Sequence, residues 1–210
     1  MSIQFRSVTK SFGTKTILRN VSFEVRKGEI YFILGKSGMG KSVTLKHIVG
    51  VMKPDQGEVW VDSQPVHSMD EIALAAIRRK CGMVFQHPAL LDSLSVYENV
   101  AFGLRTSQYS DSIGRALAES EIRSKVVETL ALVNLGPELL DRYPAEISYG
   151  MQKRVSLART LAPGPSYLLF DEPTTGLDPI TTNAVNDLIF TLSRKLSVTS
   201  VVVSHDMQCA

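Results

Sequence analysis

The sequence predicts an α/β fold in which a parallel sheet is covered by helices on both faces. Apolar strands alternate with helices in two stretches, residues 29–49 and 167–203. This order is typical of parallel sheets, because each strand must be followed by a crossover that returns the chain to the same edge. Between them lies a mostly helical stretch, residues 87–162, which we expect to be a subdomain inserted into the sheet-forming core.

The individual elements follow from residue types and from the turns between them. β-branched and aromatic residues indicate two N-terminal strands joined by a turn at Phe12-Gly13-Thr14. The sequence Lys53-Pro54-Asp55-Gln56-Gly57 is a strong turn signal before the next strand. In chain order, the expected strands are residues 3–8, 17–25, 29–34, 58–61, 82–86, 167–170 and 198–203. The expected helices are residues 41–49, 70–79, 96–104, 119–135, 148–162 and 180–195.

Composition excludes several classes of protein. Among 210 residues, 44% are hydrophobic and 21% are charged, which are values of a globular chain and not of a disordered or fibrous one. The net charge of +2 is too weak to indicate nucleic-acid binding. Cys81 and Cys209 cannot form a disulfide framework and fit a reducing compartment. No apolar run approaches the roughly 20 residues that span a bilayer, so we expect a soluble intracellular protein that meets a membrane only through a partner.

A glycine-rich segment after the strand at 29–34 fits the P-loop pattern G-x-x-x-x-G-K-[ST]. Its glycines let backbone N–H groups turn inward around phosphate oxygens, and the helix that follows adds partial positive charge. Lys41 would neutralise the β- and γ-phosphates, and the Ser42 hydroxyl would ligate Mg²⁺. The segment is Gly35-Lys36-Ser37-Gly38-Met39-Gly40-Lys41-Ser42.

Polar residues follow two other apolar strands, at the edge where ligands bind in α/β sheets. Asp171 suits a Mg²⁺ site beside the P-loop, and Glu172 is placed to orient and partly deprotonate an attacking water. The alternative is an exposed acidic turn before Pro173. His205 ends the last strand; a lone histidine is usually structural, and only the shared edge favours a role for it. These strand ends indicate a P-loop NTPase. The guanine-reading motif of GTPases is absent from the sequence, whereas a small-molecule kinase stays open at this point.

A further segment, Ile147-Ser148-Tyr149-Gly150-Met151-Gln152, precedes a predicted helix for which Ser148 is a natural N-cap. With Arg142-Tyr143-Pro144-Ala145-Glu146 upstream, it resembles the signature region of ATP-binding cassette (ABC) ATPases, usually L-S-G-G-Q. The resemblance covers nearly the whole chain. It implies a RecA-like P-loop NTPase core with a parallel sheet, an N-terminal antiparallel β subdomain and an inserted helical subdomain. The implied bounds are 1–86 and 163–210 for the core with its β subdomain, and 87–162 for the helical subdomain.

The same resemblance implies ATP and Mg²⁺ as cofactors and gives roles to further residues. Phe12 matches the aromatic residue that stacks on adenine, and Gln86 the glutamine that links the γ-phosphate and Mg²⁺ to the helical subdomain. Thr175-Gly176-Leu177-Asp178 matches the loop along the dimer interface. The implied catalytic residues are Glu172, His205 and Gln86, and the implied metal ligands are Ser42, Gln86 and Asp171. The implied ATP-binding residues are Phe12, Gly35, Lys36, Ser37, Gly38, Met39, Gly40, Lys41, Ser42, Val43, Ser148 and Gly150.

Two departures from the family pattern stand out. Tyr149 occupies the position of the first signature glycine, and Met151 a position where glutamine is common, while Ser148 and Gly150 keep the usual residues. We therefore expect function with slightly altered geometry. The chain also stops five residues after His205, where ABC ATPases continue with a helix and strands, so we expect a truncated C-terminal end.

The function implied is ATP hydrolysis that powers a membrane permease. Residues 86–105 look most like the Mla-type phospholipid-trafficking and toluene-tolerance ATPases, which implies lipid cargo. Amino-acid importer ATPases share most of these residues and stay open as an alternative. A soluble ABC protein of DNA repair or translation is disfavoured, because the chain has one P-loop and no sustained heptads. The implied partners are a second copy of the chain, an integral-membrane permease and, as an open question, a substrate-binding subunit, but no nucleic acid. The implied location is the cytoplasmic face of the inner (plasma) membrane.

Overall fold

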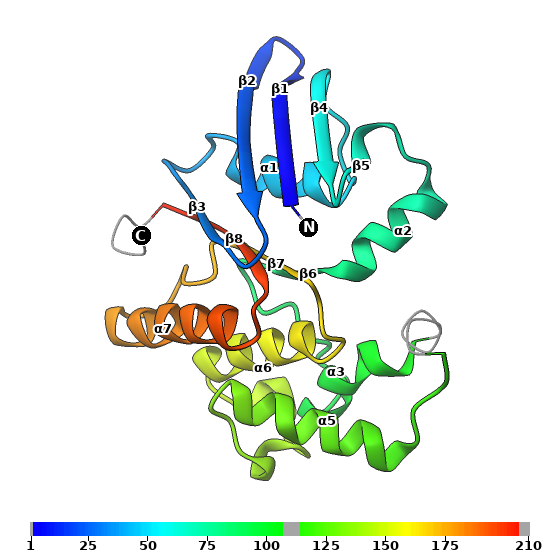
Figure 1. Cartoon of the computed structure of the whole chain (residues 1–210). Helices are drawn as coiled ribbons and strands as arrows, with labels where there is room; N and C mark the ends of the chain where they lie inside the picture. The colour runs from blue at the N-terminus through cyan, green and yellow to red at the C-terminus, as the bar shows by residue number, and fades with distance from the viewer. Residues whose placement is uncertain (1, 107–113, 206–210) are drawn as a thin grey trace. The chain divides into compact units, whose positions relative to one another are not determined.

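The computed structural model of the chain contains two units (Figure 1), and it describes residues 2–106 and 114–205. One, here the core unit, comprises Met1–Gly82, Ser166–Glu172 and Ser193–Ala210. The other, the helical unit, comprises Met83–Pro165 and Pro173–Leu192. Along the described residues, no helix is both long enough and apolar enough to cross a membrane.

Two four-stranded sheets give the core unit its α/β character, as the sequence predicts. The N-terminal sheet has the order β2-β1-β4-β5, and its paired strands are antiparallel. The second sheet has the order β3-β8-β7-β6, with β8 parallel to both β3 and β7. The strands of the first sheet are β1 (Ser2–Phe12), β2 (Lys15–Arg26), β4 (Gln56–Val61) and β5 (Gln64–Pro65). Those of the second are β3 (Ile30–Leu34), β6 (Cys81–Val84), β7 (Tyr167–Asp171) and β8 (Thr199–Ser204).

Helix α1 (Lys41–Ile48) joins the two sheets, because it contacts β4 in the first and both β7 and β8 in the second. All six residues of β8 and the first four of β7 are buried, as expected for parallel strands covered on both faces. The other helix of this unit is α2 (Glu71–Lys80), which Asp70 caps by accepting a hydrogen bond from the Ala73 N–H at 2.8 Å.

The helical unit is built from α3 (Val96–Ala101), α5 (Glu119–Leu132), α6 (Tyr149–Leu161) and most of α7 (Pro179–Lys195). Helices α3, α5 and α6 contact one another in every pairing. Short 3₁₀ turns at Val66–Ser68 (core unit), Phe102–Arg105, Pro137–Leu139 and Pro144–Glu146 complete the described elements. A capping box starts α3, with Ser95 and Glu98 each bonded to the other's backbone N–H.

Several observed boundaries differ from the predicted ones. The strand expected at 82–86 ends at Val84, which leaves Gln86 on an exposed bend. The helix expected at 96–104 changes to 3₁₀ geometry at Phe102, close to where Gly103 approaches the ring of Pro163. The helix expected to reach residue 135 ends at Leu132, because Asn134 takes a left-handed conformation that stops it.

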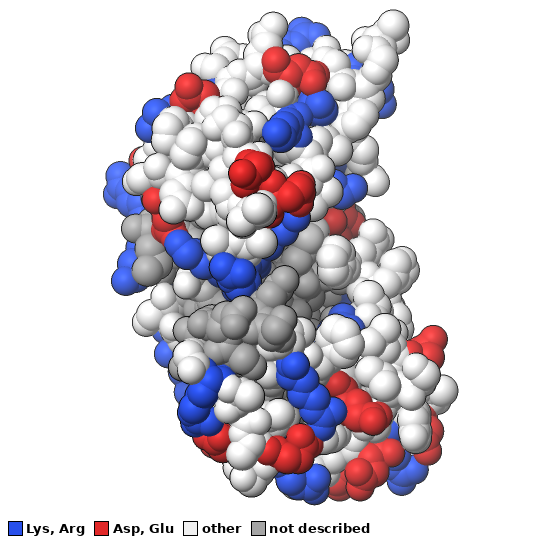
Figure 2. Space-filling model, turned by 90° about the vertical axis from the view of Figure 1, so that its right-hand side faces the viewer, with Lys and Arg blue, Asp and Glu red and all other residues white. Residues whose placement is uncertain are grey.

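Charged side chains of both signs are interspersed on the face seen in Figure 2. This matches the near balance of 23 basic and 21 acidic residues in the sequence.

Candidate functional site

The P-loop lies between β3 and α1, as the sequence predicts. Gly38 and Gly40 have φ angles of 80° and 87°, in the left-handed region that favours glycine. A Cβ on Gly40 would lie 2.6 Å from Cγ2 of Ile17, so no other residue fits there without displacement. Gly40 is the N-cap of α1 and carries no side chain that could occupy the free N–H groups of the first turn. These groups are therefore open to an anion.

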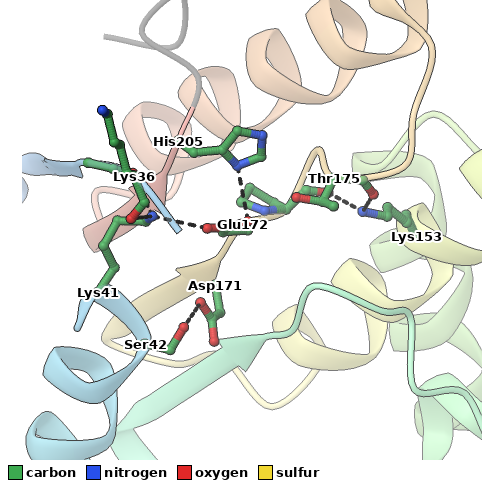
Figure 3. A network of polar contacts seen from close by, with 10 residues as sticks. Lys36, Lys41, Ser42, Lys153, Asp171, Glu172, Thr175 and His205 are labelled. Atoms are coloured by element: carbon green, nitrogen blue, oxygen red, sulfur yellow. Dashed lines mark hydrogen bonds and ion pairs between the residues drawn. The ribbon is translucent and has the colours of Figure 1, made fainter. Parts of the chain in front are cut away.

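Lys41 is the first residue of α1, and its side chain is only 5% exposed. Its ammonium donates hydrogen bonds to the carbonyl oxygens of Gly35 at 2.6 Å and Lys36 at 3.0 Å. The Glu172 carboxylate lies 3.1 Å away and supplies the counter-charge (Figure 3). The ammonium is thus held at the P-loop beside a carboxylate.

Ser42 and Asp171 meet at the end of β7. The Ser42 hydroxyl donates a 2.7 Å hydrogen bond to the Asp171 carboxylate (Figure 3). A hydroxyl and a carboxylate oxygen are ligands that Mg²⁺ accepts, and in nucleotide sites the ion takes its other ligands from phosphates and water. No cluster of three or more histidine, cysteine or acidic side chains suited to a metal occurs among the residues that the structure describes. The pair therefore fits Mg²⁺ held jointly with a nucleotide.

Parallel pairing brings Glu172 and His205 together. Leu34 pairs with Ser204, and Asp171 pairs with Val203, so β3, β7 and β8 end at one edge. Nδ1 of His205 lies 3.0 Å from Oε2 of Glu172. The sequence prediction of a shared polar edge is confirmed by these distances.

The backbone of Glu172 is unusual. Its φ is 49°, a left-handed conformation that is costly for a residue with a side chain and is further disfavoured before a proline. The Glu172 N–H donates to the Val203 carbonyl at 3.0 Å, which anchors one side of this turn. Such a conformation persists only where the surroundings hold it.

Phe12 lies at the end of β1 with 47% of its surface exposed. The ammonium of Lys10 is 5.8 Å from the centre of its ring. Asp55 holds this end of the strand, because its carboxylate accepts from Lys10 at 2.7 Å and from the Ser11 N–H at 2.7 Å. The hydrogen bond from Lys10, followed by that from Ser11, lowers the pKa of Asp55. Phe12 therefore offers an exposed ring on an anchored strand.

The remaining predicted residues belong to the helical unit, except Val43, which lies in the second position after Lys41 on α1. Ser148 caps α6 and accepts a hydrogen bond from the Met151 N–H at 3.3 Å, as predicted. A Cβ on Gly150 would lie 3.2 Å from Cγ2 of Thr181, which leaves little room for a larger residue. Gln86 is exposed.

Lys153, which the sequence analysis did not single out, is the most buried basic side chain of the helical unit, at 7% exposure. It donates to the carbonyls of Pro173 at 2.7 Å and Thr175 at 2.8 Å (Figure 3). Burial lowers its pKa to about 8. Helical spacing places it on the same face as buried Leu157, a signal that was present in the sequence.

Two other polar residues were also missed. Asn99 is fully buried; its side chain accepts from the Leu91 N–H and donates to the carbonyls of Leu91, Leu94 and Ser95. Arg159 donates to the Ala89 carbonyl at 2.8 Å, and burial lowers its pKa. Both hold main-chain segments between Pro88 and Ser95, and the sequence carries no local sign of these partners.

Comparison with known proteins gives a family and several relatives. The family model described as "ABC transporter" matches residues 18–175. The methionine import ATP-binding protein MetN of Carboxydothermus hydrogenoformans is 42% identical over 189 residues, which cover 90% of this chain and 53% of that protein. The probable ribonucleotide transport ATP-binding protein mkl of Mycobacterium tuberculosis is 39% identical over 210 residues, or 100% of this chain and 56% of that protein. The chain thus spans little more than half the length of these relatives.

Solved structures agree with these matches. The ATP-binding cassette MJ0796, in a dimeric post-hydrolysis state bound to ADP and Pi, has a TM-score of 0.85 and 34% identity, and covers 99% of this chain and 90% of its own. The protein cbiO1 from Clostridium perfringens, part of the ABC transporter complex cbiONQ, has a TM-score of 0.84 and 29% identity, and covers 97% and 78%.

Proposed function

The chain belongs to the ABC transporter family, and on that premise we propose that it is the ATP-binding and ATP-hydrolysing part of a transporter. The observation that carries this proposal is the convergence of Lys41, Ser42, Asp171, Glu172 and His205 on one end of the parallel sheet. A P-loop alone indicates nucleotide binding. The adjoining carboxylate–histidine pair supports hydrolysis.

In this proposal the P-loop N–H groups and Lys41 bind the β- and γ-phosphates. A phosphate bound by Lys41 replaces the Glu172 carboxylate as its counter-charge, which leaves that carboxylate available to a water molecule. Mg²⁺, held by Ser42 and Asp171 and, by the resemblance, Gln86, would supply neutralising charge to the phosphates. Val43 continues the helix start, and Phe12 offers its exposed ring to the adenine.

Hydrolysis then needs a base and an oriented water. Glu172 accepts a proton as the water oxygen bonds to the γ-phosphorus, and the bond to the β–γ bridging oxygen breaks with its electron pair leaving on ADP. His205, 3.0 Å from Glu172, keeps that carboxylate oriented. We expect wild-type protein to hydrolyse ATP with Mg²⁺, and a chain that binds ATP without any turnover would contradict the proposal.

We propose further that two copies of the chain share each site, with Ser148 and Gly150 of one facing the nucleotide of the other. The relative MJ0796 is dimeric in two solved structures, which supports this arrangement. A capped helix start adds N–H donors where negative charge develops on phosphate.

Complementation tests the shared site. Lys41→Ala removes the P-loop half, and Ser148→Arg blocks the other half, so each variant alone should be inactive. A mixed dimer contains one site made of two intact halves, and mixing should restore measurable hydrolysis or ATP-dependent dimerisation. Neither effect in the mixture, with Ser148→Arg folded and still binding ATP, would show that the sites are not shared.

The third proposal concerns the permease. Within residues 87–105, Leu91 is 40% exposed while Leu90 and Leu94 are half-buried, and Asn99 holds the backbone of this loop. A firm loop with an exposed apolar side chain suits docking of a membrane subunit at the cytoplasmic face. Leu91→Glu should spare ATP binding and abolish recruitment to membranes that carry the permease; unchanged recruitment would contradict this assignment.

Two alternative classes of cargo are proposed. Residues 86–105 look like those of Mla-type ATPases, which supports phospholipid. The relatives named for methionine import and ribonucleotide transport support small polar solutes as the alternative. Purifying the chain with its permease, and any substrate-binding subunit, and measuring ATPase stimulation by phospholipid vesicles against free amino acids and ribonucleotides would decide between them.

A further inference from the structure

The loop that follows Glu172 is bound to the start of α6 by two side chains, Lys153 and Tyr149. Lys153 donates to the carbonyls of Pro173 and Thr175. The same ammonium lies over the Tyr149 ring, with Nζ 5.4 Å from the ring centre. The ring also reaches Gly176, where an added Cβ would lie 3.6 Å from Cε1 of Tyr149. We call these two side chains the loop clasp.

Lys153 is an unusual residue to find at this position. A buried ammonium near the N-terminal end of a helix is disfavoured by desolvation and by the helix dipole. No carboxylate pairs with it in the part of the chain that the structure describes, so main-chain carbonyls are its hydrogen-bond acceptors. A leucine or methionine would fill the space without these costs. The hydrogen bonds to these carbonyls therefore account for a lysine at this position.

The carbonyls it binds belong to a turn that needs support. Glu172 has the left-handed φ of 49° and precedes a proline, a combination costing on the order of 1–3 kcal/mol. The Val203 carbonyl holds the N–H of Glu172 on one side. On the other side, the first carbonyl after Glu172 is that of Pro173, which Lys153 binds. The clasp thus fixes the Pro173–Thr174 peptide, one residue beyond the proposed base.

Tyr149 explains why a departure from the usual signature glycine is compatible with this site. Its ring covers the ammonium, and it remains 37% exposed while Lys153 is only 7% exposed. Its hydroxyl lies 3.3 Å from Nδ1 of His87. Glycine at position 149 would leave the ammonium open to water, which would compete with the two carbonyls.

We propose that Lys153 and Tyr149 are positioning residues for the hydrolysis reaction, because they bind the loop Pro173–Leu177 to the first turns of α6 as one body. The inference rests on the proposed function, since it concerns the same reaction. In that proposal Ser148 and Gly150 at the start of α6 and Glu172 before the loop act on nucleotide, and the clasp preserves the register between α6 and the loop.

Lys153→Met removes the ammonium and keeps the length of the side chain. We expect kcat to fall at least about 10-fold, because two charge-assisted hydrogen bonds are lost. The KM for ATP and nucleotide affinity should stay within about threefold, since the hydrogen bonds of Lys153 go to the carbonyls of Pro173 and Thr175. Arg154→Met, next along the helix and also bonded to a carbonyl, is the matched control and should behave as wild type. Tyr149→Gly should lower kcat by less, and Lys153→Arg should recover most of the loss.

Two readouts separate positioning from a general loss of stability. Amide hydrogen exchange of segment 173–178, which includes the Leu177 N–H bonded to Thr174, should accelerate in Lys153→Met while the rest of the helical unit is unchanged. In wild type, kcat should decline as pH rises through about 8, where Lys153 loses its proton; Lys153→Arg should move this decline to higher pH. Among the described residues, the titratable groups in contact with the clasp lysine or its tyrosine are Tyr149 itself and His87.

The outcomes are distinguishable. Active wild type together with an unchanged kcat and unchanged loop exchange in Lys153→Met overturns the clasp and leaves the proposed function intact. Wild type that does not hydrolyse ATP overturns the proposed function and, with it, a positioning role in hydrolysis, whatever the exchange shows. If Lys153→Met does not fold, the pH profiles of wild type and Lys153→Arg decide: identical profiles overturn the proposal.

Discussion

Each unit contains a buried lysine whose ammonium has lost its contact with water. The two lysines compensate for this loss in different ways. Lys41 and Lys153 each donate to two main-chain carbonyls and are almost inaccessible to water. Lys41 also faces a carboxylate, that of Glu172, whereas Lys153 is bonded to carbonyls and covered by a tyrosine ring. A carboxylate counter-charge can be exchanged for phosphate. Carbonyls that belong to a loop cannot be exchanged, so the second lysine fixes structure where the first can bind a ligand.

One large expected effect contrasts these two lysines in nucleotide binding. Lys41→Met should reduce ATP affinity by at least about 100-fold, because charge-assisted hydrogen bonds to phosphate are worth about 1.5–3 kcal/mol each. Lys153→Met should leave affinity within about threefold. Isothermal titration calorimetry with Mg²⁺-ATP measures both. Equal losses in the two variants would erase the distinction between a ligand-binding and a loop-binding lysine.

The next effect concerns the carboxylate partner of Lys41. Glu172→Gln should lower kcat by roughly 10²–10⁴-fold, since an amide cannot accept the proton from water. ATP binding should persist, and ATP-dependent dimers should accumulate in light scattering. Glu128→Gln is the control, because it makes the same change at an exposed glutamate on α5, and it should retain wild-type turnover. Full activity in Glu172→Gln would assign the base to another group, with His205 first to be tested.

The smallest effects are on the free energy of unfolding. In both units it should rise with pH, but in different pH ranges. In the core unit His47 is 1% exposed, its Nε2 has no hydrogen-bond partner among the described residues, and burial lowers its pKa. The unfolded chain therefore binds more protons than the folded one as pH falls below about 6.5, so the free energy of unfolding should decrease there. His47→Leu should flatten this decrease between pH 6.5 and 5 in urea unfolding.

In the helical unit, burial lowers the pKa of Lys153 from 10.5 to about 8. The unfolded chain again binds more protons, now between pH 8 and 10.5, so this lysine should raise the free energy of unfolding as pH increases, by at most about 3 kcal/mol. Lys153→Met should lack that rise and Arg154→Met should keep it. A rise that persists in Lys153→Met would mean that other groups titrate there.

The sequence was sufficient wherever a structural feature depends on neighbouring residues. The P-loop, the start of α1 at Lys41 and the cap Ser148 of α6 are each set by residues within a few positions of one another, and each was predicted correctly. Apolar runs and their polar stops predicted the ends of β7 and β8 to within one residue, at 170 and 203 where the structure has Asp171 and Ser204. The predicted helix ends were less accurate. Helix α5 ends before a residue in a left-handed conformation, and α3 ends close to the ring of a proline that is distant in the sequence.

Tertiary structure decided the features that depend on partners far apart in the chain. The pairing of β3, β7 and β8 turned three separate strand ends into one site, in which Nδ1 of His205 lies 3.0 Å from the Glu172 carboxylate. The clasp could not be predicted, because Lys153 binds carbonyl groups, which every residue carries and which leave no mark in the sequence. Apolar periodicity identifies which face of a helix is buried. It does not identify which main-chain oxygens accept hydrogen bonds from a buried ammonium, because only the folded chain brings these groups together.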